Sequence, residues 1–186
     1  MTDRIGNWIQ TYTGRPFWPL DPRPDDIFIE DVARSLSMRC RYSGHVLRFY
    51  SVAEHSVHVS RAVPPEFALW GLLHDAAEAY SADVPRPLKR NLPAWAPLEK
   101  AIMDAVKVRF ALEGDEPAIV KDVDFRICGD ERAQILHPSL LEWEELPVSL
   151  GIHLDCFAPE YAERMFLDRF YELTNGGLYQ LKTGRI

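Results

Sequence analysis

Residues 70–90 read WGLLHDAAEAYSADVPRPLKR, and this stretch dominates the prediction of the fold. It begins as an apolar helical run and continues directly into His74, Asp75 and Glu78. Helical spacing predicts that these three side chains gather at one end of a buried helix. Burying an unpaired charge costs several kcal/mol or more, so the group needs a compensating partner.

A divalent cation would compensate for this burial by binding a neutral imidazole nitrogen and a carboxylate oxygen. The alternative is an ordinary helix end that reaches solvent. The apolar run before the group and the proline-rich loop after it favour the metal site. His55, one turn inside a helix predicted to start at Val52, is a candidate ligand from a second helix. His58 is either a further ligand or a packing histidine.

The helix predicted over residues 116–136 offers two acids. Asp124 has Val120 and Ile127 at helical spacing, so we expect it within the apolar face. Asp130 is flanked by polar positions, and we expect it to be solvated. If one acid of this helix reaches the site, the pattern therefore predicts Asp124.

The composition suits one globular domain over residues 1–186, since 47% of the residues are apolar and 26% are charged. The net charge of −7 would repel a phosphate backbone, so we expect no nucleic-acid partner. The three cysteines form no CxxC pair, which argues against a thiolate zinc site. No signal pattern or membrane-spanning run is present, so a soluble, cytoplasmic protein is expected.

The expected fold is mostly α, with an extended proline-rich arm over residues 14–31 and a small β-hairpin over residues 40–52 around Ser43 and Gly44. Ser51 and Glu54 match a capping box, in which each side chain satisfies the other's backbone amide. Helices are predicted from apolar periodicity over residues 29–38, 52–63, 65–80, 97–112, 116–136 and 159–173.

Four segments together resemble the H…HD…D signature of HD-domain phosphohydrolases: EHS at 54–56, LLHDAAEAY at 72–80, DVPRPLK at 83–89 and VKDVDFRI at 120–127. The resemblance spans about Ala33 to Glu131 and is greatest to bacterial and phage deoxynucleotide 5′-nucleotidases and dATP triphosphohydrolases. It implies an HD-domain helical bundle with one divalent metal ion (Mn, Co, Zn, Fe or Ni), held by His55, His74, Asp75 and Asp124.

The resemblance also implies roles around that ion. Glu78 and Asp83 would position or protonate groups during phosphoester cleavage. The PxPxK pattern implies that Lys89 neutralises phosphate. Arg41 and Tyr42 would contact sugar and base, although the similar enzymes more often carry tryptophan at the aromatic position. His45 could reach a phosphate or simply occupy the turn.

The expected function is metal-dependent hydrolysis of nucleotides, with 2′-deoxynucleoside mono- or triphosphates as substrates. The alternatives are hydrolysis of a signalling nucleotide, or a metal-stabilised binding or regulatory module without activity. Members of the resembling family are commonly oligomeric, so we expect a homo-oligomer. Its predicted contact surfaces are the arm from Phe17 to Phe28 and the last helix around Phe166 and Phe170.

Overall fold

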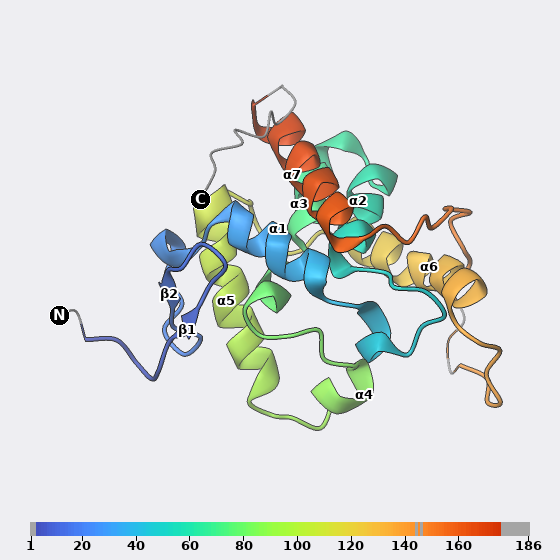
Figure 1. Cartoon of the computed structure of the whole chain (residues 1–186), viewed down its shortest axis with the longest axis horizontal. Coiled ribbons are helices and arrows are strands. Elements are labelled where there is room, and N and C mark those ends of the chain that lie inside the picture. The colour runs from blue at the N-terminus through green and yellow to red at the C-terminus, as the bar shows by residue number, and fades with distance from the viewer. Residues whose placement is uncertain (1–2, 144, 146, 176–186) are drawn as a thin grey trace.

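The computed structural model of the chain describes residues 3–143, 145 and 147–175 (Figure 1). The described residues are mostly helical, which confirms the predicted fold class at that level. The helices are α1 (Ile29–Met38), α2 (Val52–Ala62), α3 (Ala68–Leu73), α4 (Arg86–Lys89), α5 (Trp95–Phe110), α6 (Ala118–Ile135) and α7 (Pro159–Asn175). No helix among these residues is both long and apolar enough to cross a membrane.

The core lies where helices from distant parts of the sequence meet. Helices α1, α2, α3 and α7 pack against one another, as Figure 1 shows for α7 beside α2 and α3. Helix α6 packs on α2, and α5 packs against a 3₁₀ turn at Ala76–Ala79. Fully buried side chains such as Val57, Leu72 and Phe166 belong to one continuous apolar cluster. This packing brings the start of α2, the end of α3 and the middle of α6 together.

Gly71 allows α3 to lie close to α2. A Cβ atom at this position would be 3.0 Å from the Cα of Ser60 and 3.2 Å from its backbone nitrogen. Backbone atoms cannot yield as a flexible side chain can, so a larger residue would push the helices apart. Because His74 follows one turn later, this close approach also sets its distance from α2.

The predicted helix over residues 65–80 is wrong as one continuous element. A 3₁₀ turn at Pro65–Phe67 precedes α3, which ends at Leu73, and a second 3₁₀ turn follows at Ala76–Ala79. Asp75 lies at the break with φ −98° and ψ 11°, the bridge region of backbone space. The backbone nitrogen of Glu78 donates to the Asp75 carbonyl oxygen at 2.9 Å, as the tighter 3₁₀ pattern requires. The turn, not an α-helical face, therefore positions the acids of this stretch.

A small hairpin is present, but not where it was predicted. Strands β1 (Ile9–Gln10) and β2 (Pro16–Phe17) pair antiparallel within the N-terminal arm. In place of the predicted hairpin over residues 40–52, Arg41–Gly44 form a 3₁₀-like turn, and Cys40 and Ser51 make an isolated bridge. Tyr42 and Ser43 have φ of 55° and 52°, left-handed conformations that strand pairing cannot accommodate.

The aromatic residues proposed as oligomer contacts are part of the chain's own core. Phe17 and Phe166 are fully buried and Phe170 is 8% exposed, so these side chains are not available to a partner. Whether the rest of the arm and of the last helix contacts a second copy stays a prediction. Exposed apolar side chains occur at Leu20 in the arm and before it at Trp8 and Tyr12.

Helix α2 starts at Val52 as predicted, but its capping box is only half formed. The Ser51 side chain accepts a hydrogen bond from the Glu54 backbone nitrogen at 3.1 Å. The fully buried Glu54 carboxylate instead accepts from the backbone nitrogens of Cys156 and Phe157 at 2.9 and 2.8 Å. Glu54 thus ties the start of α2 to the segment before α7.

The loop after α6 explains two features of that helix. A Cβ atom on Gly129 would be 2.9 Å from the carbonyl oxygen of Pro147, so glycine is required for the loop to approach. Asp130 is 4% exposed and accepts from the backbone nitrogens of Leu150 and Gly151 at 2.8 and 2.9 Å. The prediction that Asp130 is solvated was wrong, because loop amides cover it.

Candidate metal centre and active site

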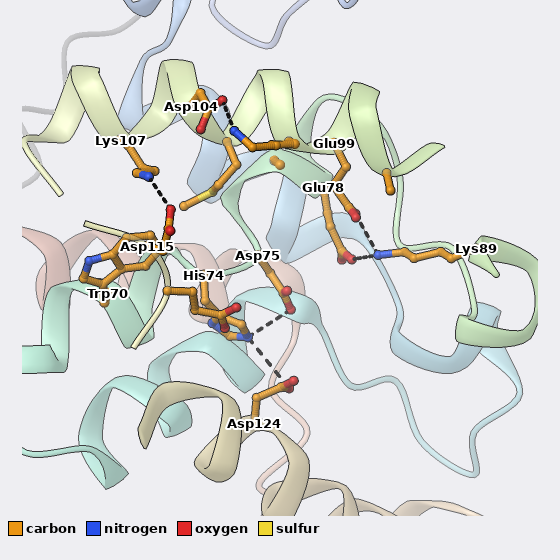
Figure 2. A pocket seen from close by; sticks show the side chains of 15 residues that line it. Trp70, His74, Asp75, Glu78, Lys89, Glu99, Asp104, Lys107, Asp115 and Asp124 are labelled. Atoms are coloured by element: carbon orange, nitrogen blue, oxygen red, sulfur yellow. Dashed lines mark hydrogen bonds and ion pairs between the residues drawn. The ribbon is translucent and has the colours of Figure 1, made fainter. Parts of the chain in front are cut away.

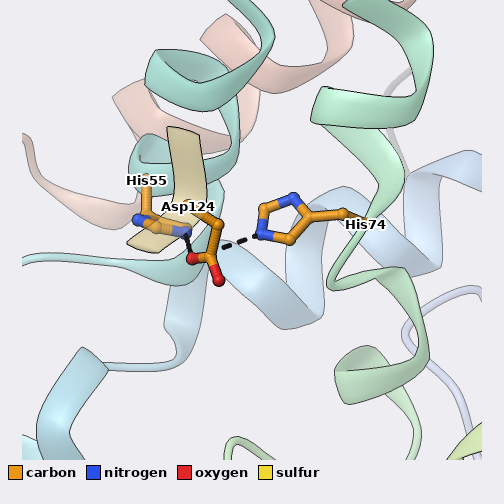
Figure 3. A group of neighbouring side chains, drawn as sticks. All are labelled: His55, His74 and Asp124. Atoms are coloured by element: carbon orange, nitrogen blue, oxygen red, sulfur yellow. Dashed lines mark ion pairs between the residues drawn. The ribbon is translucent and has the colours of Figure 1, made fainter. Parts of the chain in front are cut away.

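His55, His74 and Asp124 come from α2, the end of α3 and α6 and form a group that could hold a metal ion (Figure 3). Asp124 Oδ1 lies 3.1 Å from His55 Nε2 and 3.8 Å from His74 Nε2. Asp75 approaches the same point, with Oδ2 3.3 Å from His74 Nε2 and 3.8 Å from His55 Nε2. The four predicted metal ligands therefore lie together, although they come from three separate parts of the sequence.

Both imidazole rings are held so that Nε2 faces the carboxylates. His74 Nδ1 lies 2.8 Å from the Gly71 carbonyl oxygen, which can only accept, so Nδ1 donates the hydrogen bond. His55 Nδ1 likewise donates to Glu131 Oε1 at 2.8 Å. In the neutral rings Nε2 then carries the lone pair that a metal requires. Neither of these buried Nε2 atoms has a hydrogen-bond partner among the described residues.

Neighbouring charges and burial have opposite effects on the pKa values of His74 and Asp75. Burial opposes a charge on His74, but the negative charges of Asp75 and Asp124 outweigh it and raise the pKa of His74 well above 6.5. Burial raises the pKa of Asp75, yet the charge of His74 prevails and lowers it to about 2. These pKa directions favour a protonated His74 in the metal-free chain, so a cation that binds here would compete with a proton.

Glu78 lies beside this group and is 5% exposed. Burial, reinforced by the charges of Asp75 and Asp83, raises the pKa of Glu78 to about 9, against the opposing charge of Lys89. Lys89 Nζ lies 3.1 Å from Glu78 Oε1 and 2.7 Å from Glu99 Oε1 (Figure 2). Burial also raises the pKa of Asp83. Glu78 can thus hold a proton near neutral pH, the property that a general acid needs.

Two cavities open onto the metal group, and both are lined by Asp75, Glu78, Lys89 and Asp124. The first, of about 360 Å³, also has Glu99, Asp104, Asp115 and Glu116 in its wall, and we call it the acidic cavity (Figure 2). The second, of about 620 Å³, is the aromatic cavity, whose further lining includes Arg41, Tyr42, Asp83, Arg86, Arg90, Phe125 and Trp143. Its size matches those of typical small-molecule sites.

Arg41 and Tyr42 lie between the aromatic cavity and Glu131, a residue that the sequence prediction missed. Tyr42 Oη donates to Glu131 Oε2 at 2.5 Å, and Arg41 Nε lies 3.1 Å from Glu131 Oε1. Arg41 Nη1 is also 3.8 Å from Asp75 Oδ2. Glu131 follows Asp124 by two helical turns on α6, and this spacing was the available signal.

Two predicted residues stay apart from the metal group. His45 ends the turn after Gly44, is exposed, and is absent from the lining of both described cavities, so its role stays a prediction. His58 Nε2 lies 3.7 Å from Glu54 Oε1, on the side of α2 that faces the segment before α7. The structure therefore favours the packing interpretation of His58 over the ligand interpretation.

The fold and the site define a helical protein with a buried histidine and carboxylate group that could hold a metal ion. No protein-family model matches the chain. The chain is 37% identical over 171 residues to the uncharacterized protein YfdR of Escherichia coli, covering 90% of this chain and 96% of YfdR, and it therefore belongs to the YfdR family. It is also 37% identical over 124 residues to an uncharacterized protein of Rhodobacter capsulatus, covering 61% of this chain and 63% of that protein.

Proposed function

We propose that this protein is a divalent-metal-dependent phosphohydrolase of nucleotides, with 2′-deoxynucleoside mono- or triphosphates as its substrates. One observation carries the proposal. The Nε2 atoms of His55 and His74 are buried without hydrogen-bond partners among the described residues and face the carboxylate of Asp124. Such a set of ligands suits a first-row divalent metal ion. The resemblance to HD-domain phosphohydrolases supports the same assignment.

His55, His74, Asp75 and Asp124 would hold the ion. When bound, a divalent ion supplies Lewis-acid polarisation of a phosphoryl oxygen and lowers the pKa of a coordinated water toward about 7. The protein's own part is to hold the imidazoles in one tautomer and to keep the carboxylates ionised. The Gly71 carbonyl and the Glu131 carboxylate serve the first purpose.

Glu78 and Asp83 would serve proton transfer and positioning. Glu78 holds its proton near neutral pH and lies in the wall of both cavities, so it can deliver that proton to a leaving oxygen or orient a water. The hydrogen bond that Lys89 Nζ donates to Glu78 Oε1 restrains the Glu78 carboxyl group, and Glu99 restrains Lys89 from the other side. Lys89 and Arg41 would meet the negative charge of a phosphate.

The aromatic cavity is the better place for a nucleotide. Arg41, Arg86 and Arg90 line it beside the metal group, whereas the acidic cavity adds several carboxylates there. Phe125 and Trp143 offer ring faces on which a base could stack. The aromatic cavity therefore has more cationic and fewer acidic side chains than the acidic cavity, which makes it the more favourable of the two for an anion. A base stacked on Phe125 or Trp143 would place the phosphate near the metal ligands Asp75 and Asp124 in the same cavity.

The test is phosphorus NMR of the products formed from a panel of deoxynucleoside mono- and triphosphates, in metal-free protein and after addition of Mn²⁺, Co²⁺, Zn²⁺, Fe²⁺ or Ni²⁺. Release of phosphate or triphosphate that needs added metal supports the proposal and identifies the bond cleaved. Activity confined to a signalling nucleotide would favour that alternative. Stoichiometric metal binding without hydrolysis of any substrate would favour a binding or regulatory module.

We also propose that the chain forms a homo-oligomer. Phe17, Phe166 and Phe170 themselves are buried in the chain's own core, so contacts around them would use neighbouring side chains. Exposed apolar side chains of the N-terminal segment offer a surface that overlaps the predicted arm at Leu20, namely Ile5 at 65%, Trp8 at 54%, Tyr12 at 63% and Leu20 at 62%. Burial of such a surface against a second copy would be favourable at about 25 cal/mol per Å² of apolar area.

A further inference from the structure

Glu131 lies behind the metal group rather than in it. Its side chain is fully buried, and it lines neither of the two cavities described above. A carboxylate in such a place is costly unless strong donors surround it. The identity of those donors indicates what Glu131 does.

Both carboxylate oxygens of Glu131 are used. Oε1 accepts from His55 Nδ1 at 2.8 Å and lies 3.1 Å from Arg41 Nε. Oε2 accepts from Tyr42 Oη at 2.5 Å and from Arg41 Nη2 at 3.2 Å. One buried carboxylate therefore joins His55, a candidate metal ligand, to Arg41 and Tyr42 in the wall of the aromatic cavity.

We propose that Glu131 is a positioning residue that couples metal binding to substrate binding, by fixing the His55 tautomer on one side and the Arg41 and Tyr42 side chains on the other. The proposal rests on the proposed function, because it assigns Glu131 to the same metal ion and the same nucleotide. Glu131 itself touches neither.

On the metal side, the argument concerns the direction of one hydrogen bond. A carboxylate can only accept, so it forces His55 Nδ1 to donate and leaves the Nε2 lone pair facing Asp124. A glutamine at position 131 has one oxygen and one NH₂ group. If the NH₂ group faced His55, the ring would adopt the other tautomer and present Nε2–H to the metal.

On the substrate side, the argument concerns a strained turn. Tyr42 has φ 55° and the next residue, Ser43, has φ 52°, left-handed conformations that are unfavourable in non-glycine residues. Such a turn persists only if side chains hold it. The Tyr42 phenol and the Arg41 guanidinium are both anchored on Glu131, which keeps them at the wall of the aromatic cavity.

The experiment compares Glu131→Gln with wild type in two measurements. Calorimetric titration of metal-free protein with Mn²⁺ should show binding weakened by about 10- to 100-fold, the usual cost of losing an outer partner of a metal ligand. At saturating Mn²⁺, the KM for dAMP or dATP should rise while kcat largely recovers. Tyr42→Phe, which leaves the bond from His55 to Glu131 in place, should raise KM and keep the Mn²⁺ affinity of wild type.

Asp130→Asn is the matched control, because it also neutralises a buried carboxylate on α6 but one that accepts only from Leu150 and Gly151 among the described residues. It should keep the Mn²⁺ affinity of wild type. Equal weakening in Asp130→Asn and Glu131→Gln would overturn the inference. If Glu131→Gln does not fold, Glu131→Asp decides, since it keeps charge and both oxygens but withdraws them by one methylene and should still weaken binding.

The outcomes separate the inference from the proposed function. A wild type that binds Mn²⁺ but hydrolyses no nucleotide would overturn the proposed function, while the Mn²⁺ affinities would still decide the role of Glu131 on the metal side. Wild-type Mn²⁺ affinity in Glu131→Gln would overturn the inference and leave the proposed function intact. A wild type that binds no divalent metal would overturn both.

Discussion

Asp124 Oδ1 lies 3.1 Å from His55 Nε2, which joins the middle of α6 to the first turn of α2. His55 is fully buried while Asp124 lies in the wall of both cavities, and the geometry leaves a nitrogen lone pair and a carboxylate facing one point. We therefore expect Asp124→Asn to lose metal, because the amide brings no negative charge to the ligand set.

The contrast with Asp130→Asn tests that assignment on the same helix. Asp130 accepts two backbone hydrogen bonds from the loop at Leu150 and Gly151. Its amide variant should retain the metal and lose about 1–3 kcal/mol of unfolding free energy, the usual effect of a buried unsatisfied group. Metal content by mass spectrometry and thermal unfolding check the pair. Retained metal in Asp124→Asn together with its loss in Asp130→Asn would show that the wrong acid was assigned.

The sequence predicted most helices because their signals are local. Ser51 marks the start of α2, and apolar spacing marks α5, α6 and α7. The break after Leu73 was missed, because the apolar run has no proline signal at that point. The turn there is held by short-range bonds, from His74 Nδ1 to the Gly71 carbonyl and from the Glu78 backbone nitrogen to the Asp75 carbonyl, which apolar spacing does not reveal.

The residues of the candidate site were also predicted only in part. His55, His74 and Asp124 could be selected because each interrupts an apolar face or follows one. Asp130 was wrongly assigned to solvent and Glu131 was not selected despite its spacing from Asp124, since adjacent acids in an amphipathic helix normally indicate a solvated surface. Their burial arises from a loop and a turn far away in sequence, which cover them in the folded chain.

Glu78→Gln should retain its metal and lose most of its hydrolysis rate. The carboxyl group can hold and transfer a proton, since burial and neighbouring acids raise its pKa to about 9, and an amide cannot. Proton transfer by a positioned group contributes about 10²- to 10⁴-fold, which sets the expected loss in kcat. Glu99→Gln is the matched control, because it also loses an ion pair to Lys89 but leaves Glu78 unchanged. Metal loss in Glu78→Gln would make Glu78 a ligand instead.

Stability and metal affinity should respond to pH in opposite directions. In the metal-free protein, the negative charges of Asp75 and Asp124 overcome burial and raise the pKa of His74 above its unfolded value of 6.5. The stabilisation from the protonated ring is therefore fully present below about pH 6.5 and is lost as the pH rises through the raised pKa. Metal needs the deprotonated ring, so its affinity should increase over the same range.

Thermal unfolding between pH 6 and 9, with and without Mn²⁺, measures both effects. The metal-free midpoint should fall with rising pH while the increase caused by Mn²⁺ becomes larger. Proton release on binding should appear as a dependence of the calorimetric heat on the buffer's ionisation enthalpy. A Mn²⁺ effect that weakens with rising pH would contradict the assigned ligands.

Tyr42 should favour deoxynucleotides over ribonucleotides. Its phenol donates to Glu131, so it can accept from a 2′ hydroxyl but cannot donate to it. A buried hydroxyl without a partner costs about 1–3 kcal/mol, which sets an upper limit of roughly 5- to 150-fold on the preference in kcat/KM, and a bond to the phenol oxygen would reduce it. Kinetics with dAMP, AMP, dATP and ATP check the preference in wild type and in Tyr42→Ala. An unchanged ratio in the variant would remove Tyr42 from this role.

The central claim, that a metal ion held by these ligands makes the protein a phosphohydrolase, is tested most directly by metal content and hydrolysis in the same preparations. The measurement compares wild type, His74→Ala and Asp75→Ala. The account predicts one divalent ion per chain with metal-dependent nucleotide hydrolysis in wild type, and loss of both in each variant. Full hydrolysis with stoichiometric metal in either variant would contradict it.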